Sequence, residues 1–192
     1  MHFQILLAGL LGWLIGGAAQ AAPPDGAKLY SKNCAVCHGQ SGNGGIGIPL
    51  ALASFQSSID DDYLRRTIRH GRPGRVMPAF NALSDAEVDA IVKHVRSWNK
   101  GPRRRFAMRR ISGDPKHGKQ LFSQYCAACH GANGEGGKGT GVTFSRPRDL
   151  PIMAPALHNP GFLASATDSM IKTILIKGRA GTPMRPFLKA GL

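Results

Sequence analysis

The feature that most restricts this chain is a five-residue pattern, Cys-x-x-Cys-His, that occurs twice. The copies span residues 34–38 and 126–130, and together they use all four cysteines of the 192-residue sequence. Each copy lies inside a longer block, because residues 26–47 match residues 118–139 at a constant offset of 92, with 12 of 22 positions identical. Two copies of one short module indicate a chain built from two similar domains.

A second block repeats further along the chain. A Gly-Arg-x-Gly turn followed by Met and Phe occupies residues 71–80 and again residues 178–187, now at an offset of 107. The second copy therefore holds 15 more residues between the two blocks than the first copy does. We predict four segments, which are residues 1–21 as a leader, 22–100 as the first domain, 101–113 as a basic linker and 114–192 as the second domain.

The spacing of the cysteine pattern points to a covalently attached cofactor. Two thiols with two residues between them lie about one helical turn apart and can add to the two vinyl groups of one porphyrin edge. The histidine directly after the second thiol is then placed against the iron as its proximal ligand. We predict two covalently bound haem c groups, attached through Cys34, Cys37, Cys126 and Cys129, with His38 and His130 as iron ligands.

Other uses of the four cysteines explain fewer residues. A structural zinc site brings its cysteine pairs within about 12 to 20 residues of each other, whereas 88 residues separate Cys37 from Cys126. A thioredoxin-like redox pair requires a βαβ context, and the sequence shows none. Disulfides are compatible with an oxidising compartment, but they leave the two histidines unexplained.

Helix-start signals and apolar spacing favour an all-α chain. Asp25 and the pair Asp114-Pro115 are suited to begin helices that lead into the two cysteine patterns. Ser84 opens a capping box ahead of a segment with one apolar face. No segment alternates as a strand would. We expect helices over residues 26–33, 60–71, 84–98, 114–125 and 167–178.

The N-terminus predicts export. Residues 3–19 are apolar apart from Gln4, and Ala19-Gln20-Ala21 then supplies the small-x-small pattern of a signal-peptidase site. We predict a signal peptide over residues 1–21 that is cleaved after Ala21. The alternative is a retained membrane anchor, although about 17 residues at ~1.5 Å each fall short of the ~30 Å hydrocarbon core. Under either interpretation the rest of the chain lies in the periplasm.

The two cysteine patterns, each with a methionine downstream, resemble the dihaem class I c-type cytochromes. The resemblance implies two tandem all-α domains, each folded round one haem, with a methionine from a late loop as the sixth iron ligand. The matching residues are Met77 and Met184, and Met153 and His158 compete for the second iron. The family also orients its proximal histidine through a proline carbonyl, for which the candidates are Pro49 and Pro155.

The second domain departs from the family pattern at its end. More than 20 residues follow Met77 in the first domain and include the expected helix over 84–98, but only eight residues follow Met184. The resemblance implies that this last helix packs on the first helix of its domain. We therefore expect the second domain to lack its C-terminal helix, to leave Leu121 and Phe122 poorly covered, and to be the less stable of the two.

Irons held by both histidine and methionine have no open coordination position, which favours electron transfer over catalysis. The resemblance implies a cytochrome that carries electrons between respiratory partners, free or as a subunit of a respiratory complex. The alternative is a dihaem redox enzyme of the peroxidase or sulfur-compound oxidase type, in which Met184 is displaced.

The net charge of +14 indicates acidic or anionic partners. Residues 101–119 alone carry seven basic residues and one acidic residue. We expect acidic redox proteins, such as an oxidase, a dehydrogenase or another respiratory complex, with an anionic membrane surface as a second candidate. We expect no nucleic acid among the partners. The alternative for the linker is a solvated connection with no partner.

Overall fold

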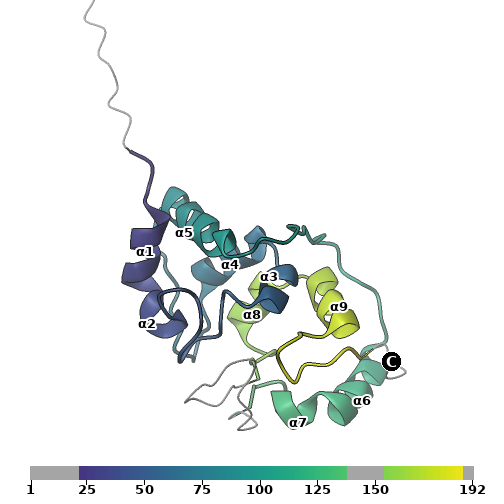
Figure 1. The fold of residues 1–192 in the computed structure, drawn as a ribbon. Coiled ribbons are helices and arrows are strands. Elements are labelled where there is room, and N and C mark those ends of the chain that lie inside the picture. Colours follow the sequence, from purple (N-terminus) through teal and green to yellow (C-terminus); the bar gives the residue numbers. More distant parts are fainter. Residues whose placement is uncertain (1–21, 138–153, 188–192) are drawn as a thin grey trace, which may run out of the picture.

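The computed structural model describes residues 22–137 and 154–187. These residues form helices joined by loops, and none of them lies in a strand, so the all-α prediction is confirmed. Figure 1 shows the first half, with α1 (Gly26–Asn33), α2 (Ala35–His38), α3 (Ala53–Ser57), α4 (Asp61–His70) and α5 (Asp85–Ser97), and the second half, with α6 (Pro115–Tyr125), α7 (Ala127–His130), α8 (Pro160–Ser165) and α9 (Asp168–Lys177). The predicted leader over 1–21 lies outside the described residues. Of the helices in the described ranges, none has both the length and the apolar character to cross a membrane.

The expected helix starts are present. The side chains of Asp25 and Asp114 accept hydrogen bonds from the first backbone N–H groups of α1 and α6, and Ser84 caps α5 in a capping box. Asp60 and Thr167 cap α4 and α9 at equivalent positions. Each cap satisfies donors that the helix itself leaves unpaired and is worth about 1 kcal/mol.

Helix α1 packs against α5, and the two lie side by side in Figure 1. Gly26 allows the close approach, because a Cβ built on it would lie 2.1 Å from the backbone oxygen of Ala90. One turn later the rings of Tyr30, His94 and Trp98 contact one another, with centroids 5.1–5.3 Å apart. Tyr30 is only 1% exposed, so this contact closes the core of the first half.

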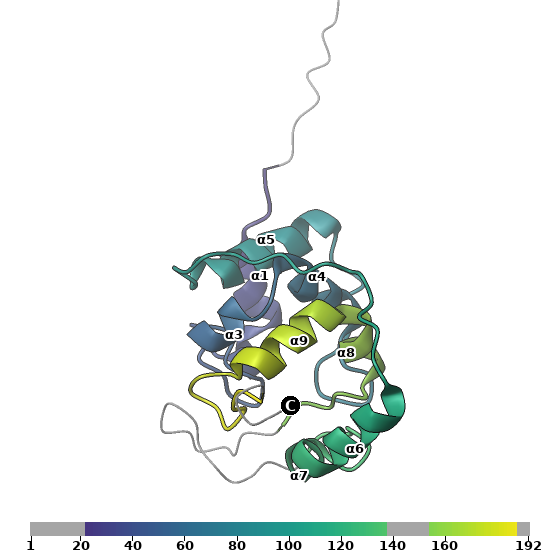
Figure 2. The same ribbon diagram turned by 90° about the vertical axis from the view of Figure 1, so that its right-hand side faces the viewer.

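Helix α6 is the equivalent of α1, but the described part of the second half holds no counterpart of α5. A Cβ on Gly118, the equivalent of Gly26, would meet no atom of the described residues within 4 Å. Phe122, the equivalent of the buried Tyr30, is half-buried, and no residue of α6 is buried. The expectation of poor cover holds for Phe122, whereas Leu121 is half-buried like its equivalent in α1. In Figures 1 and 2, α6 and α7 lie at the far end of the molecule from α1 and α5.

The two equivalent glycines provide a matched pair of stability predictions. We expect Gly26→Ala to destabilise the protein by about 1–3 kcal/mol, because the backbone of Ala90 must move to admit the methyl group. Gly118→Ala is expected to be neutral or to stabilise the protein by up to about 1 kcal/mol, because alanine is the better helix former and its Cβ meets open space. Denaturant unfolding of the holoprotein, followed by far-ultraviolet circular dichroism, measures both effects. Equal effects at the two positions would contradict the difference in packing.

The two halves meet through equivalent elements. The hydroxyl of Ser54 in α3 donates to the carbonyl of Ala180 at 2.6 Å, and the amide of Asn159 next to α8 donates to the carbonyl of Pro73 at 2.8 Å. Pro73 and Ala180 are equivalent at the offset of 107. Helices α4 and α8 also pack directly against each other. The halves therefore contact each other through a reciprocal interface as well as through the linker.

The basic linker runs along both halves (Figure 2). The backbone N–H groups of Phe106 and Ile111 donate to the carboxylates of Asp60 at 3.0 Å and Asp168 at 2.8 Å, at the N-terminal ends of α4 and α9. The linker backbone is thus fixed at two points. The side chains of Arg104, Arg105, Arg109 and Arg110 are exposed.

Candidate haem-attachment sites

The first cysteine pattern begins at Cys34, between α1 and α2, and continues through α2, which holds Cys37 and His38. The carbonyl of Cys34 accepts hydrogen bonds from the N–H groups of Cys37 at 3.2 Å and His38 at 3.0 Å, which gathers two half-buried thiols and the imidazole in a single turn. Both thiols are free. Burial, with a smaller effect of Cys37, raises the pKa of Cys34 to about 11, so this group is a neutral thiol at neutral pH.

The imidazole of His38 is oriented by the loop that follows α2. Its Nδ1 lies 2.9 Å from the carbonyl oxygen of Ile48, so the acceptor predicted from the sequence, Pro49, is wrong by one residue. Gly47 accounts for the difference. Its N–H donates to the carbonyl of Cys37 at 2.8 Å, and a Cβ on it would lie 2.7 Å from the His38 ring. The chain therefore passes close beside the ring and presents the Ile48 carbonyl to it.

Two properties of His38 suit a metal ligand. A carbonyl acceptor at Nδ1 fixes the tautomer that leaves the lone pair on Nε2. Burial lowers the pKa of His38, which favours the neutral ring that binds iron.

The second site repeats this arrangement despite its longer loop. Nδ1 of His130 lies 2.9 Å from the carbonyl oxygen of Pro155, which confirms Pro155 as the acceptor. Pro155 and Ile48 are equivalent at the offset of 107, so the 15-residue expansion leaves the acceptor position unchanged. In the same loop the N–H of His158 donates to the carbonyl of Gly134 at 2.9 Å, as the equivalent pair does in the first half. His158 is therefore fixed in the loop that orients His130, and Met153 lies outside the described residues.

The thiols of the second site are more open than those of the first. Cys126 is half-buried and Cys129 is exposed, and both are free. The carbonyl of Cys126 accepts hydrogen bonds from the N–H groups of Cys129 at 3.1 Å and His130 at 2.9 Å, which is the same turn as in the first half. Burial raises the pKa of Cys126. The attachment turn is thus duplicated, with the thiols more exposed in the second copy, although His130 is buried and His38 is half-buried.

Met77 and Met184 lie in loops with the same backbone hydrogen bonds. The N–H of Arg72 donates to the carbonyl of Met77 at 2.9 Å, and the N–H of Arg179 donates to the carbonyl of Met184 at 2.6 Å. Both methionines are half-buried. Each loop begins at a glycine with positive φ, which is Gly71 in the first half and Gly178 in the second. Each loop ends where a phenylalanine N–H donates to a carbonyl of the preceding helix, Phe80 to Ile68 in the first half and Phe187 to Leu175 in the second.

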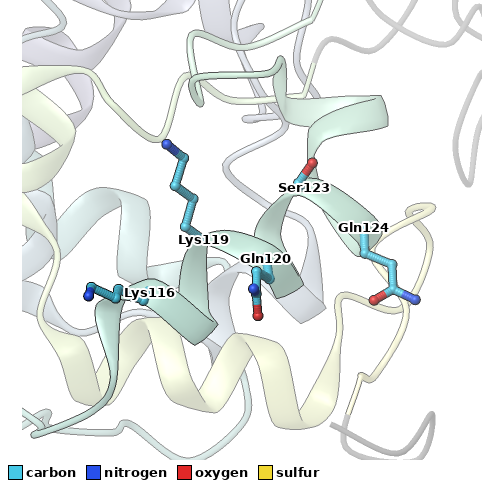
Figure 3. A pocket seen from close by; sticks show the side chains of 5 residues that line it. All are labelled: Lys116, Lys119, Gln120, Ser123 and Gln124. Carbon is cyan, nitrogen blue, oxygen red and sulfur yellow. The ribbon is translucent and has the colours of Figure 1, made fainter.

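The donor groups fit haem better than a metal ion held by side chains alone. Within residues 22–137 and 154–187, no group of three or more histidine, cysteine, aspartate or glutamate side chains is placed to hold a metal ion. A haem needs only axial ligands from the protein, because the porphyrin supplies four nitrogens. A pocket on α6 contains none of the predicted site residues; its lining, shown in Figure 3, consists of Lys116, Lys119, Gln120, Ser123 and Gln124.

Residues 21–95 and 113–191 each match the family described as cytochrome c oxidase, cbb3-type, subunit III. The chain belongs to this family. Each matched region contains one cysteine pattern and one methionine loop, so the cbb3-type subunit III family accounts for both halves. The resemblance to dihaem c-type cytochromes and the presence of covalently bound haem c are thereby confirmed, and the architecture is two tandem cytochrome c domains.

The known proteins that this chain resembles in sequence are longer than the part that it matches. The cbb3-type cytochrome c oxidase subunit CcoP of Azospirillum sp. (strain B510) is 27% identical over 188 residues, covering 90% of this chain and 55% of that protein. The dihydro-haem d1 dehydrogenase of Pseudomonas aeruginosa is 41% identical over 86 residues, covering 44% of this chain and 17% of that protein. The chain spans about half the length of the oxidase-subunit relatives that it matches.

A solved structure shows the same fold. A chain of the reducing HAO-like protein complex of Kuenenia stuttgartiensis has a TM-score of 0.58 to this structure, with 20% sequence identity, and the match covers 86% of this chain and 88% of that one. At this identity the likeness concerns the fold alone.

Proposed function

We propose that this chain is a periplasmic dihaem cytochrome that carries electrons between respiratory partners as a subunit of an oxidase complex. The observation that supports this most strongly is the duplicated arrangement: each half holds a cysteine pair, a histidine oriented by a loop carbonyl, and a methionine loop with the same backbone bonds. The proposed attachment residues are Cys34, Cys37, Cys126 and Cys129, and the proposed axial ligands are His38, Met77, His130 and Met184.

A loop carbonyl orients each of the two histidines proposed as proximal ligands. The carbonyl acceptors of His38 and His130 hold the rings in one tautomer and one orientation, so that binding requires little rearrangement. When bound, each haem supplies a one-electron iron couple whose potential depends on its axial ligands and surroundings. With Met77 and Met184 in the sixth positions, neither site offers a place for substrate, and this favours electron transfer over catalysis.

The loop positions favour Met184 over His158 at the second iron. The backbone of His158 is bonded to Gly134, in the turn that follows His130. A haem held here would take its sixth ligand from a segment other than the one that orients His130. Met184 lies in a separate loop, bonded to Arg179 in the same way that Met77 is bonded to its own arginine.

The remaining assignments follow the sequence. We propose residues 22–100 and 114–192 as the two domains, 101–113 as the linker, and 1–21 as an export signal, with 3–19 as an anchor if the signal is retained. The exposed linker arginines suit an acidic redox protein, such as an oxidase or dehydrogenase subunit, or an anionic membrane surface. The relatives named as cbb3-type oxidase subunits support the oxidase.

Carbon monoxide binding distinguishes this function from the enzymatic alternative. We expect the reduced holoprotein to bind carbon monoxide at neither haem, because methionine occupies both sixth positions. Absorption difference spectra of the reduced protein with and without the gas measure this, and Met184→Ala serves as a positive control that opens one position. Tight binding by the unmodified protein at one haem would instead support a dihaem redox enzyme, a class for which the match to a dehydrogenase over 86 residues provides some support.

A further inference from the structure

The basic linker is held against both halves by its backbone, which leaves its arginine side chains exposed. Residues 101–113 contain five arginines and no acidic residue. The N–H groups of Phe106 and Ile111 donate to the carboxylates of Asp60 and Asp168, and the Phe106 side chain packs against the hydrophobic core. The linker therefore presents its side chains from a backbone that is fixed at two points.

Most of the linker charge is not neutralised by the described protein. Arg103 pairs with Asp61 at 3.4 Å. The carboxylates of Asp60 and Asp168 accept from the linker backbone and pair with none of its guanidinium groups in the described segments. Four linker arginines form no ion pair within residues 22–137 and 154–187, and these are Arg104, Arg105, Arg109 and Arg110. Their charges are therefore available to an anionic partner.

Exposed apolar side chains lie among these arginines. Met108 is 68% exposed between Arg105 and Arg109, and Ile111 is 41% exposed after the second arginine pair. At the surface of an anionic bilayer, cationic side chains are attracted to the headgroups while apolar side chains enter the boundary of the acyl chains. The composition of the linker suits such a surface.

The position of the linker favours a membrane over a redox protein. In Figure 1 it passes over the upper side of the molecule, whereas α2 and α7, which hold the two attachment histidines, lie at the left and at the bottom. A redox protein must approach a haem closely, because electron transfer slows steeply with distance, and a lipid surface has no such requirement. Residues 22–25 also project from the upper side in Figures 1 and 2. An anchor over residues 3–19, if retained, would bring the membrane to this side.

We propose that residues 103–111 bind the anionic phospholipid surface of a membrane and hold the two cytochrome domains against it. This deepens the proposed function, on which it rests, by choosing the membrane as the partner of the linker. Each arginine near an anionic bilayer raises the affinity by about fivefold, and salt weakens the attraction by screening. The four unpaired arginines together are expected to raise it on the order of several hundredfold.

The test is flotation of the exported holoprotein with phosphatidylcholine vesicles that contain or lack about 30% phosphatidylglycerol. At low salt we expect binding to the anionic vesicles to exceed binding to the neutral vesicles at least about tenfold, and we expect high salt to reduce the difference. Arg105→Gln with Arg109→Gln is expected to lower binding to the anionic vesicles about tenfold or more. Arg105→Lys with Arg109→Lys keeps the charge and is expected to retain most of the binding.

A matched control removes the same charge elsewhere. Lys32→Gln with Lys177→Gln alters exposed residues in the last turns of α1 and α9, whereas the linker contacts the first turn of α9, and we expect it to retain most of the binding. Any retained part of residues 3–19 contributes equally to both variants.

Two results would overturn this inference. One is equal loss of binding in the arginine and lysine variants, or no preference of the unmodified protein for anionic vesicles. The other is slower electron transfer from the arginine variant to an isolated cytochrome oxidase with vesicle binding unchanged, which would assign the linker to an acidic protein. A haem count other than two would count against the proposed function instead, and the haem count does not depend on these arginines.

Discussion

Removal of the second cysteine pair is expected to loosen the packing of α6 and α7 on the rest of the protein. Removal of the first pair is expected to leave α1 packed on α5. Cys126→Ala with Cys129→Ala removes the covalent haem from a half in which no residue of α6 is buried and α6 packs mainly on α7. Cys34→Ala with Cys37→Ala removes the other haem, but α1 keeps its contact with α5, where Tyr30 is 1% exposed. We therefore expect the haem to be a larger share of the core in the second half.

Hydrogen exchange with mass spectrometry measures this difference. In the variant without the second cysteine pair, we expect amides of residues 115–130 to exchange at least about tenfold faster than in the wild type, since local opening there meets few remaining contacts. In the variant without the first pair, we expect a smaller change over residues 26–38. Intact mass confirms that each variant has lost one haem. Equal loss of protection in the two variants would contradict the asymmetry and, with it, the expected lower stability of the second domain.

Replacing either proposed methionine ligand by histidine is expected to lower the potential of one haem and not the other. Met77→His should act on the haem of the first half and Met184→His on that of the second. Histidine stabilises ferric iron relative to methionine, and axial ligands set haem potentials over a range of about 0.8 V, so we expect a shift on the order of 0.1 V or more. A spectroelectrochemical titration that resolves two one-electron steps measures both shifts.

Two other methionines serve as controls for the ligand assignment. Met108 is 68% exposed in the linker and Met170 is 1% exposed in α9, and we expect Met108→Leu and Met170→Leu to leave both potentials nearly unchanged. If Met184→His leaves both potentials unchanged while His158→Ala shifts one of them, the second iron is bound by His158 and the assignment of Met184 is wrong.

The longer helices α1, α4, α5, α6 and α9 and the attachment turns were predictable because they depend on local chemistry, whereas the short helices α3 and α8 were not expected. Caps such as Asp25, Ser84 and Asp114 satisfy N–H groups within their own helix, and the cysteine pattern needs one turn of chain. The acceptor of His38 was misplaced because a backbone carbonyl has no side-chain signature. Its position depends on how Gly47 brings the chain against the ring. The offset of 107 pairs Ile48 with Pro155 and is the signal that identifies this residue.

The junction between the halves was not predictable in the same way. Arg72 and Arg179 occupy identical places in the repeat. The repeat does not show that Arg72 donates to a carbonyl of α8 at 3.1 Å, or that Arg179 lies over the ring of Phe55 in α3. Long-range contacts of this kind depend on how two domains meet, which local patterns do not encode.

The most direct test of a dihaem electron-transfer protein is the number of haems per chain. A pyridine haemochrome assay on purified, exported protein of measured mass should give two haem c groups for each chain, attached through the two cysteine patterns. A ratio of one, or haem released by acidified organic solvent, would contradict the account.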